Sequence, residues 1–107
     1  MNNIHTIKIG YRSYKLQRMT KIEAEREASW GQCDCQEGII RIFPNHDDKV
    51  TANTLLHEML HAIHHEWHIN DGDNEENIVT KFANGITTLF NDNPDLIRYI
   101  AREFIEC

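Results

Sequence analysis

The sequence predicts an α+β domain in which a small N-terminal antiparallel β-sheet or hairpin is followed by three helices. Short segments with alternating apolar and polar residues occupy the first part of the chain, and apolar residues spaced by three or four fill the second. The 107 residues, 40% of them hydrophobic, suit one compact core. We therefore expect a single domain, mainly β over residues 1–46 and mainly helical over residues 51–107.

The first part of the chain predicts strands separated by one charged segment. Apolar and polar residues alternate in "TIKI", residues 6–9, and the rhythm continues in "YKLQRM", so we expect one or two strands here. The segment "TKIEAEREAS" is charged and has few apolar residues, which predicts a short helix or an ordered loop. "QCDCQEGIIRIFP" predicts a hairpin of two strands joined by a tight turn at Glu37-Gly38 and closed by Pro44.

The second part predicts three helices. From about Thr51 to Trp67 one apolar face is formed by Leu55, Leu56, Met59, Leu60, Ile63 and Trp67. "NDGDN", residues 70–74, ends this helix and offers Asp73 or Asn74 as the cap of the next. The apolar residues of that next helix are Ile78, Val79, Phe82, Ala83, Ile86, Leu89 and Phe90. Asn93 is the expected N-cap of the last helix, whose apolar residues are Leu96, Ile97, Ile100, Ala101, Phe104 and Ile105.

The charge distribution argues against two classes of partner. The formal net charge is −6, and no cluster of Lys and Arg could neutralise a phosphate backbone, so we expect no nucleic-acid ligand. No segment is apolar enough to span a membrane, and the N-terminus lacks the basic and apolar regions of a signal peptide. The sequence therefore predicts a cytoplasmic protein with no membrane attachment.

The three cysteines, Cys33, Cys35 and Cys107, form an odd set, which favours reduced thiols. "CDC" is open to interpretation as a metal-binding or redox pair. No second cysteine pair at zinc-finger spacing accompanies it, so we favour two small residues that point inward from a strand.

"HEMLH", residues 57–61, is the strongest functional motif in the chain. His57 and His61 are one helical turn apart, so both imidazoles can bind one Zn²⁺, and Glu58 is placed to act as a general base. With 7 histidines in the chain, roughly 0.04 accidental matches to His-Glu-x-x-His are expected. The motif also lies opposite the apolar face of the predicted helix, so we predict a zinc site.

A catalytic zinc site needs one more protein ligand and an open position for water. The remaining histidines near the motif lie too far along the helix or on other sides, and we interpret as rim or solvated residues His64, His65 and His68. The next helix opens with two carboxylates, Glu75 and Glu76, of which the helical wheel slightly prefers Glu75. Both are also open to interpretation as first-turn carboxylates that interact with the helix dipole.

"TLLHEMLHAI" followed by "EENIVTKFANGI" resembles the small prophage-type metallopeptidase domains of the ImmA/IrrE group, over about residues 51–93. These gluzincin-like enzymes carry His-Glu-x-x-His on one helix and a glutamate ligand on the next. Their third-ligand pattern, E-x-x-A-N-x-F-A, is similar to "ENIVTKFA", with Val79 for Ala and Thr80 for Asn, and this register selects Glu76. The resemblance implies a minimal zincin-like fold in which "GIIRIF" is the edge strand along which an extended peptide lies.

Three functions are compatible with these features. The first is a zinc-dependent endopeptidase that cleaves a protein or peptide substrate, with His57, His61 and Glu76 as metal ligands and Glu58 as the base. The second is a zinc-containing module of phage origin that binds a protein without cutting it. The third is a structural protein with accidental histidines. The spacing selects neither an oligomeric state nor a stabiliser of the oxyanion among His64, His65, His68, Tyr11, Tyr14 and Tyr99.

Overall fold

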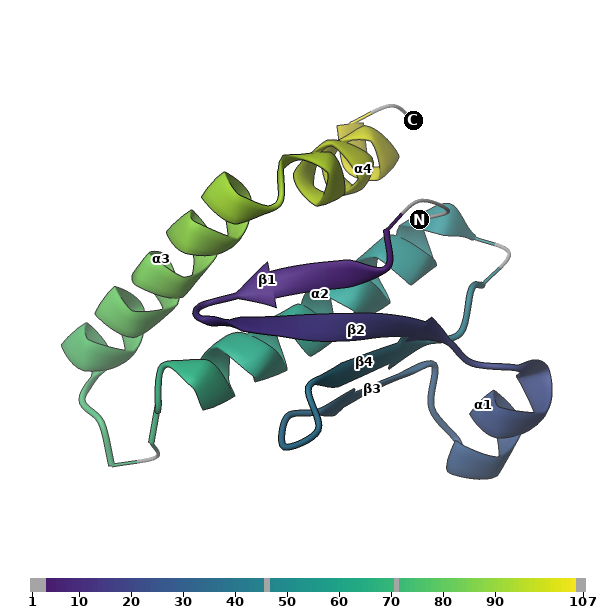
Figure 1. Cartoon of the computed structure of the whole chain (residues 1–107), viewed down its shortest axis with the longest axis horizontal. Helices are drawn as coiled ribbons and strands as arrows, with labels where there is room; N and C mark the ends of the chain where they lie inside the picture. The colour runs from purple at the N-terminus through teal and green to yellow at the C-terminus, as the bar shows by residue number, and fades with distance from the viewer. Residues whose placement is uncertain (1–3, 46, 71, 106–107) are drawn as a thin grey trace.

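The computed structural model describes residues 4–45, 47–70 and 72–105, with side chains up to residue 103 (Figure 1). The elements in chain order are β1 (Thr6–Ile9), β2 (Arg12–Arg18), α1 (Lys21–Glu27), β3 (Gly31–Asp34), β4 (Ile39–Ile42), α2 (Asp48–Glu66), α3 (Glu75–Asp92) and α4 (Pro94–Ile105). The predicted α+β class, with strands first and three helices after them, is confirmed. The predicted core roles of Phe104 and Ile105, and the state of Cys107, lie outside the described residues and side chains.

The four strands form one sheet in the order β1-β2-β4-β3. β1 pairs antiparallel with β2 through a turn at Gly10, whose φ of +66° is a conformation that favours glycine, and β3 pairs antiparallel with β4. β2 and β4 are parallel, so the expectation of a purely antiparallel sheet was wrong. Parallel neighbours need a crossover connection, which the segment containing α1 and β3 supplies here.

This topology changes which strand lies at the edge of the sheet. β4, which contains most of "GIIRIF", lies between β2 and β3, so the prediction that it forms the edge was wrong. The terminal strand on this side is β3, and β3 lies directly against α2. The edge of the sheet nearest the His-Glu-x-x-His helix is therefore Gly31–Asp34.

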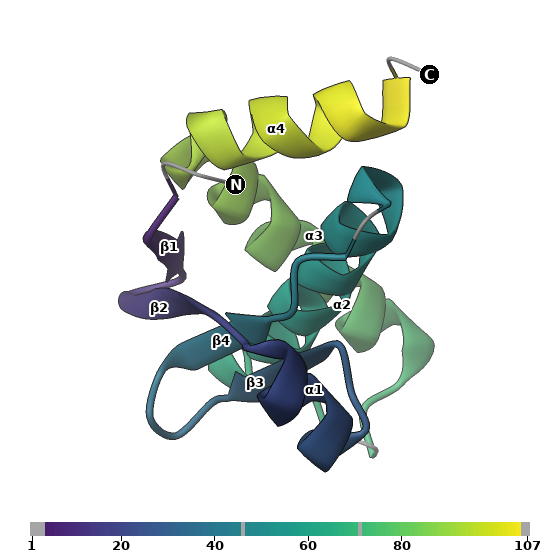
Figure 2. The ribbon, with the colours of Figure 1, turned by 90° about the vertical axis from the view of Figure 1, so that its right-hand side faces the viewer.

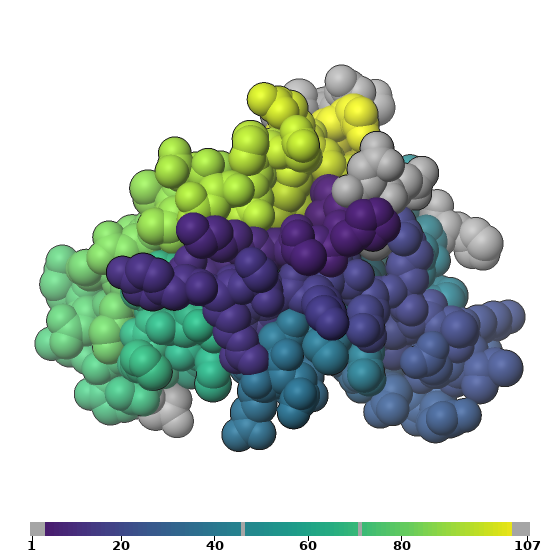
Figure 3. Space-filling view, in the orientation of Figure 1, coloured from purple at the N-terminus to yellow at the C-terminus, as the bar shows by residue number. Residues whose placement is uncertain are grey.

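One face of the sheet carries the core. The side chains that alternate inward from the strands pack with one side of α2, and the central buried residues are Ile7, Ile9, Tyr14, Ile40, Ile42, Leu55, Met59, Ala62 and Ile63. α2 crosses behind the sheet, α3 contacts β1, and α4 contacts α2 and α3 (Figures 1 and 2). The opposite face of β1 and β2 is open to solvent (Figure 3).

Local signals place the helix ends. Thr20 and Glu23 form a capping box at α1, which confirms a short helix in "TKIEAEREAS". Asn74, not Asp73, caps α3, because its side chain accepts a hydrogen bond from the Asn77 amide at 2.8 Å. None of the helices within the described ranges is long and apolar enough to cross a membrane.

Two details of the predicted helical packing were wrong. On α3, Val79 and Phe90 are 55% and 51% exposed and Ala83 is exposed as well, because only a narrow strip around Gly85 and Leu89 is buried. Asn93 lies at the predicted position before α4, and its backbone carbonyl oxygen accepts from the Ile97 amide at 3.2 Å. Its side chain, however, does not cap this helix and bonds to both backbone groups of Lys8 on β1, at 2.9 and 2.8 Å. Asn93 therefore ties the end of α3 to the sheet.

Candidate functional site

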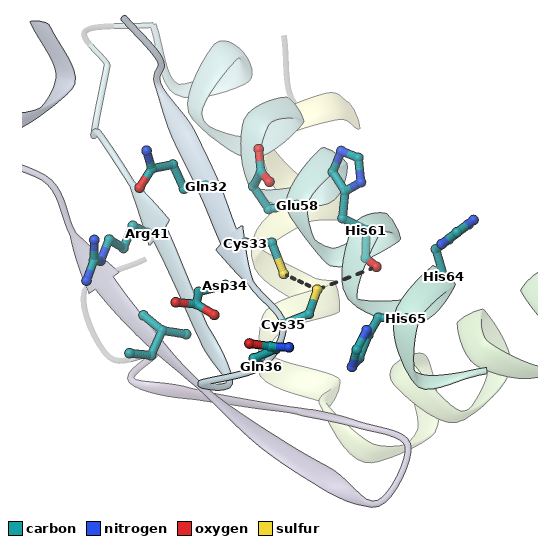
Figure 4. A pocket seen from close by; sticks show the side chains of 11 residues that line it. Gln32, Cys33, Asp34, Cys35, Gln36, Arg41, Glu58, His61, His64 and His65 are labelled. Atoms are coloured by element: carbon teal, nitrogen blue, oxygen red, sulfur yellow. Dashed lines mark hydrogen bonds between the residues drawn. The ribbon is translucent and has the colours of Figure 1, made fainter. Parts of the chain in front are cut away.

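An open cleft of about 800 Å³ lies between the edge of the sheet and the middle turns of α2 (Figure 4). One wall is β3 with the turn that follows it, residues 32–36. The other wall is α2, which contributes Glu58, His61, His64 and His65. The cleft therefore brings together two segments that are more than twenty residues apart in the sequence.

His57 and His61 meet on the exposed side of α2, as their spacing predicts. Their Nε2 atoms are 3.1 Å apart, and their rings are 4.8 Å apart between centroids and inclined by 73°. Two nitrogens at this separation fit a shared ion with about 2 Å to each ligand. The pair therefore has the geometry that two zinc ligands need.

Glu58 lies beside this pair but, unlike it, is buried. The residue is only 7% exposed and lines the cleft. Burial raises the pKa of its carboxyl group, and the charges of His57 and His61 act in the opposite direction. A carboxylate with a raised pKa is a better proton acceptor, which suits the predicted role of general base.

Gly31 allows β3 to lie this close to α2. A Cβ atom at position 31 would lie 2.7 Å from Thr54 Cγ2 and 3.1 Å from Glu58 Oε2. No side chain larger than hydrogen fits there without a shift of Thr54. The sequence analysis did not identify Gly31 or Thr54, because their contact joins two elements that are distant in the sequence. A glycine at the end of a strand was a weak signal of such a close approach.

Glu75 and Glu76 do not join the histidine pair in this structure. Both are exposed in the first turn of α3, which begins near the C-terminal end of α2, beyond the turns that carry His57 and His61 (Figure 1). Across the ranges that the structure describes, no three His, Cys, Asp or Glu side chains are grouped to hold a metal ion. The histidine pair therefore has no third donor of these types grouped with it among the described residues.

The loop before α3 is fixed by its own contacts. Lys81 Nζ donates to Asp73 Oδ2 at 2.8 Å and to the carbonyl oxygen of His68 at 3.1 Å. His68 itself is exposed and adopts a φ of +52° just after α2. These contacts join α3 to the loop that precedes it and to His68 just after α2.

Cys33 and Cys35 point from β3 and its turn toward α2 (Figure 4). Both are free thiols, their Sγ atoms are 3.2 Å apart, and Cys35 Sγ lies 3.9 Å from the carbonyl oxygen of His61. Burial and the contact with Cys35 raise the pKa of the Cys33 thiol. The prediction of two inward-pointing residues on one strand was wrong for Cys35, which lies in the turn after β3; both thiols are half-buried and form part of the cleft wall.

The candidates for oxyanion stabilisation differ in whether they line the cleft. His64 and His65 line the rim of the cleft, where they are exposed. The Tyr14 hydroxyl is buried and donates to Glu66 Oε2 at 2.7 Å, and burial raises its pKa. Tyr11 is fully exposed in the β1–β2 turn. Among the candidates for oxyanion stabilisation, only His64 and His65 line the cleft.

Comparisons of the chain with protein-family models, with curated proteins and with solved structures found no match.

Proposed function

We propose that this chain is a cytoplasmic zinc-dependent peptidase that hydrolyses a peptide bond in a protein or peptide substrate. One observation carries the proposal. The Nε2 atoms of His57 and His61 converge at 3.1 Å, and the neighbouring Glu58 is buried with its carboxyl group in a cleft. A purely structural metal site has no need of an acid–base residue beside it.

The site residues have two roles, metal binding and proton transfer. His57 and His61 hold zinc, and Glu76 of α3 is the proposed third ligand. Zinc, when bound, polarises a carbonyl group and activates water for attack on it. Glu58 takes a proton from the attacking water and passes it to the leaving amine.

Recruitment of Glu76 requires the first turn of α3 to approach α2. Glu76 is exposed, whereas the Lys81 and Asp73 ion pair holds the loop before α3. Metal binding releases free energy that can drive such a rearrangement. The resemblance of "ENIVTKFA" to the ImmA/IrrE pattern supports Glu76 over Glu75.

The edge of the sheet supports a peptide as the substrate. β3 is the terminal strand of the described sheet and forms one wall of the cleft that contains Glu58. An extended peptide can pair with the outer edge of such a strand through backbone hydrogen bonds. A peptide bound there would run past Glu58 and His61.

The test is Glu58→Gln, with Glu25→Gln on the exposed face of α1 as the matched control. Each zinc-loaded protein is incubated with a mixed peptide library, and cleavage is followed by mass spectrometry. We expect Glu58→Gln to retain zinc and to lose at least about 100-fold in cleavage rate, because the amide cannot accept the proton. Full cleavage by Glu58→Gln, or less than a tenth of an equivalent of zinc in the wild type as a rough limit, would overturn the proposal.

One observation favours a second candidate, a zinc-containing module of phage origin that binds a protein without cutting it. The described residues hold no assembled third ligand beside His57 and His61. Such a module would use the same cleft and the β3 edge. It predicts that the zinc-loaded wild type retains peptides from the library and cleaves none.

A further inference from the structure

Two thiols lie in the cleft outside the proposed catalytic set. Cys33 extends from β3 and Cys35 from the turn after it, and both reach toward α2 (Figure 4). Their Sγ atoms are 3.2 Å apart, and neither is in a disulfide.

The position of the turn is set by contacts from other elements. The Arg12 guanidinium of β2 donates to the carbonyl oxygens of Cys35 and Gln36. The same guanidinium lies 3.7 Å from Glu66 Oε2 on α2 and 5.3 Å from the centre of the Tyr14 ring. The sulfur pair is therefore held in place by the sheet and by α2 together.

The Arg12 side chain packs closely against Gly38 in this turn. Gly38 has a φ of +72°, and a Cβ atom there would lie 3.0 Å from Arg12 Nε. A glycine thus permits both the turn conformation and the close approach of the guanidinium. These contacts fix the hairpin turn and with it the positions of the two sulfur atoms.

The chemistry of the two walls of the cleft differs. Thiolate sulfur is a soft ligand that selects ions such as Cu⁺ and Zn²⁺, whereas carboxylate oxygen suits hard ions and imidazole is intermediate. The sulfur pair shares the cleft with Glu58 and His61, and Cys35 Sγ lies 3.9 Å from the carbonyl oxygen of His61 on α2. The sulfur pair therefore favours softer ions than the histidine pair does.

We propose that Cys33 and Cys35 form a two-sulfur binding site for a soft, thiophilic cation, separate from the His57–His61 pair. On binding, two S–H bonds break, two sulfur–metal bonds form, and two protons pass to solvent. The remaining coordination positions face the open cleft. The site does not depend on the peptidase activity.

The test uses Cd²⁺ as the soft cation, added to the metal-free protein under reducing conditions. All variants carry Cys107→Ser, so that Cys33 and Cys35 are the remaining cysteines. Binding is followed by the ultraviolet charge-transfer band between thiolate and cadmium. We expect saturation at one Cd²⁺ per chain, with a loss of affinity of at least about 100-fold in Cys33→Ser and in Cys35→Ser.

The matched control is the double variant His57→Ala, His61→Ala, which should keep the cadmium band and its affinity. Circular dichroism confirms that each variant is folded, and Cys33→Ala replaces Cys33→Ser if the serine is not tolerated. Undiminished Cd²⁺ affinity in both single cysteine variants, or loss of the band in the histidine variant, would overturn the proposal. Neither result affects the peptidase proposal, whose test is the Glu58→Gln variant in zinc.

Discussion

Gly31→Ala tests whether the edge of the sheet and α2 are packed as the structure shows. The added Cβ atom would lie 2.7 Å from Thr54 Cγ2, a distance that such atoms essentially never adopt, and 3.1 Å from Glu58 Oε2. Gly31 does not have a positive φ, so backbone strain does not contribute. The expected effect is therefore a steric one between β3 and α2.

The expected change in the unfolding free energy of Gly31→Ala is the sum of two opposing effects. Overpacking of a well-packed contact costs about 1–3 kcal/mol. Replacing glycine by alanine recovers about 0.4–1 kcal/mol, because the unfolded chain loses conformational freedom. The net loss of unfolding free energy is about 1 kcal/mol, which lowers the Tm of a domain of this size by about 4–8 °C.

A second substitution can relieve the same clash. Thr54→Ser removes Cγ2 and keeps the hydroxyl group, which donates to the carbonyl oxygen of Val50 at 2.9 Å. The double variant Gly31→Ala, Thr54→Ser should regain most of the stability lost in Gly31→Ala. Urea unfolding of the wild type, the two single variants and the double variant gives the coupling free energy between positions 31 and 54. We expect this coupling to stabilise the double variant by at least about 0.5 kcal/mol.

Gly72→Ala is the matched glycine control, because nothing lies within 4 Å of a Cβ atom built there. It should leave the unfolding free energy unchanged or slightly higher. If Gly31→Ala is as stable as Gly72→Ala, or if Thr54→Ser gives no rescue, the close approach of β3 to α2 is refuted.

The remaining predictions concern three glutamates. Burial raises the folded-state pKa of Glu58 above its ordinary value of 4.5, so the metal-free protein should lose stability as the pH rises from below 4.5 through that folded-state pKa. In urea unfolding with a chelator, Glu58→Gln should therefore have a higher free energy of unfolding than the wild type at pH 8, but not at pH 4. The same difference in unfolding free energy at both pH values would contradict this prediction. Glu76→Ala should weaken zinc retention on dialysis by at least about tenfold while Glu75→Ala leaves it nearly unchanged, and the reverse order would identify Glu75 as the ligand.

The features that the sequence predicted correctly depend on local spacing. The alternation in "TIKI" and the apolar rhythm of α2 placed these elements correctly, and the Glu37-Gly38 signal placed the hairpin, although its turn is longer and spans residues 35–38. The one-turn separation of His57 and His61 likewise predicted their meeting, because helix geometry alone sets it. Such features need no knowledge of what the rest of the chain does.

The features that were wrong or missed depend on contacts between distant segments. Alternation cannot distinguish a central strand from an edge strand, so the parallel pairing of β2 with β4 and the edge position of β3 did not follow from the pattern. The apolar spacing of α3 likewise did not reveal that Val79 and Phe90 are exposed, because burial depends on where the neighbouring elements lie.

The sequence by itself determined the α+β class, most of the elements and the placement of His57, Glu58 and His61 on one helix, because backbone geometry and residue spacing specify them locally. Only the tertiary structure decided that β3 faces this helix, that Gly31 allows the contact with Glu58 and that Cys33 and Cys35 line the same cleft. These arrangements arise from the pairing of strands and the packing of α2 on the sheet, which sum many weak contacts over the whole chain.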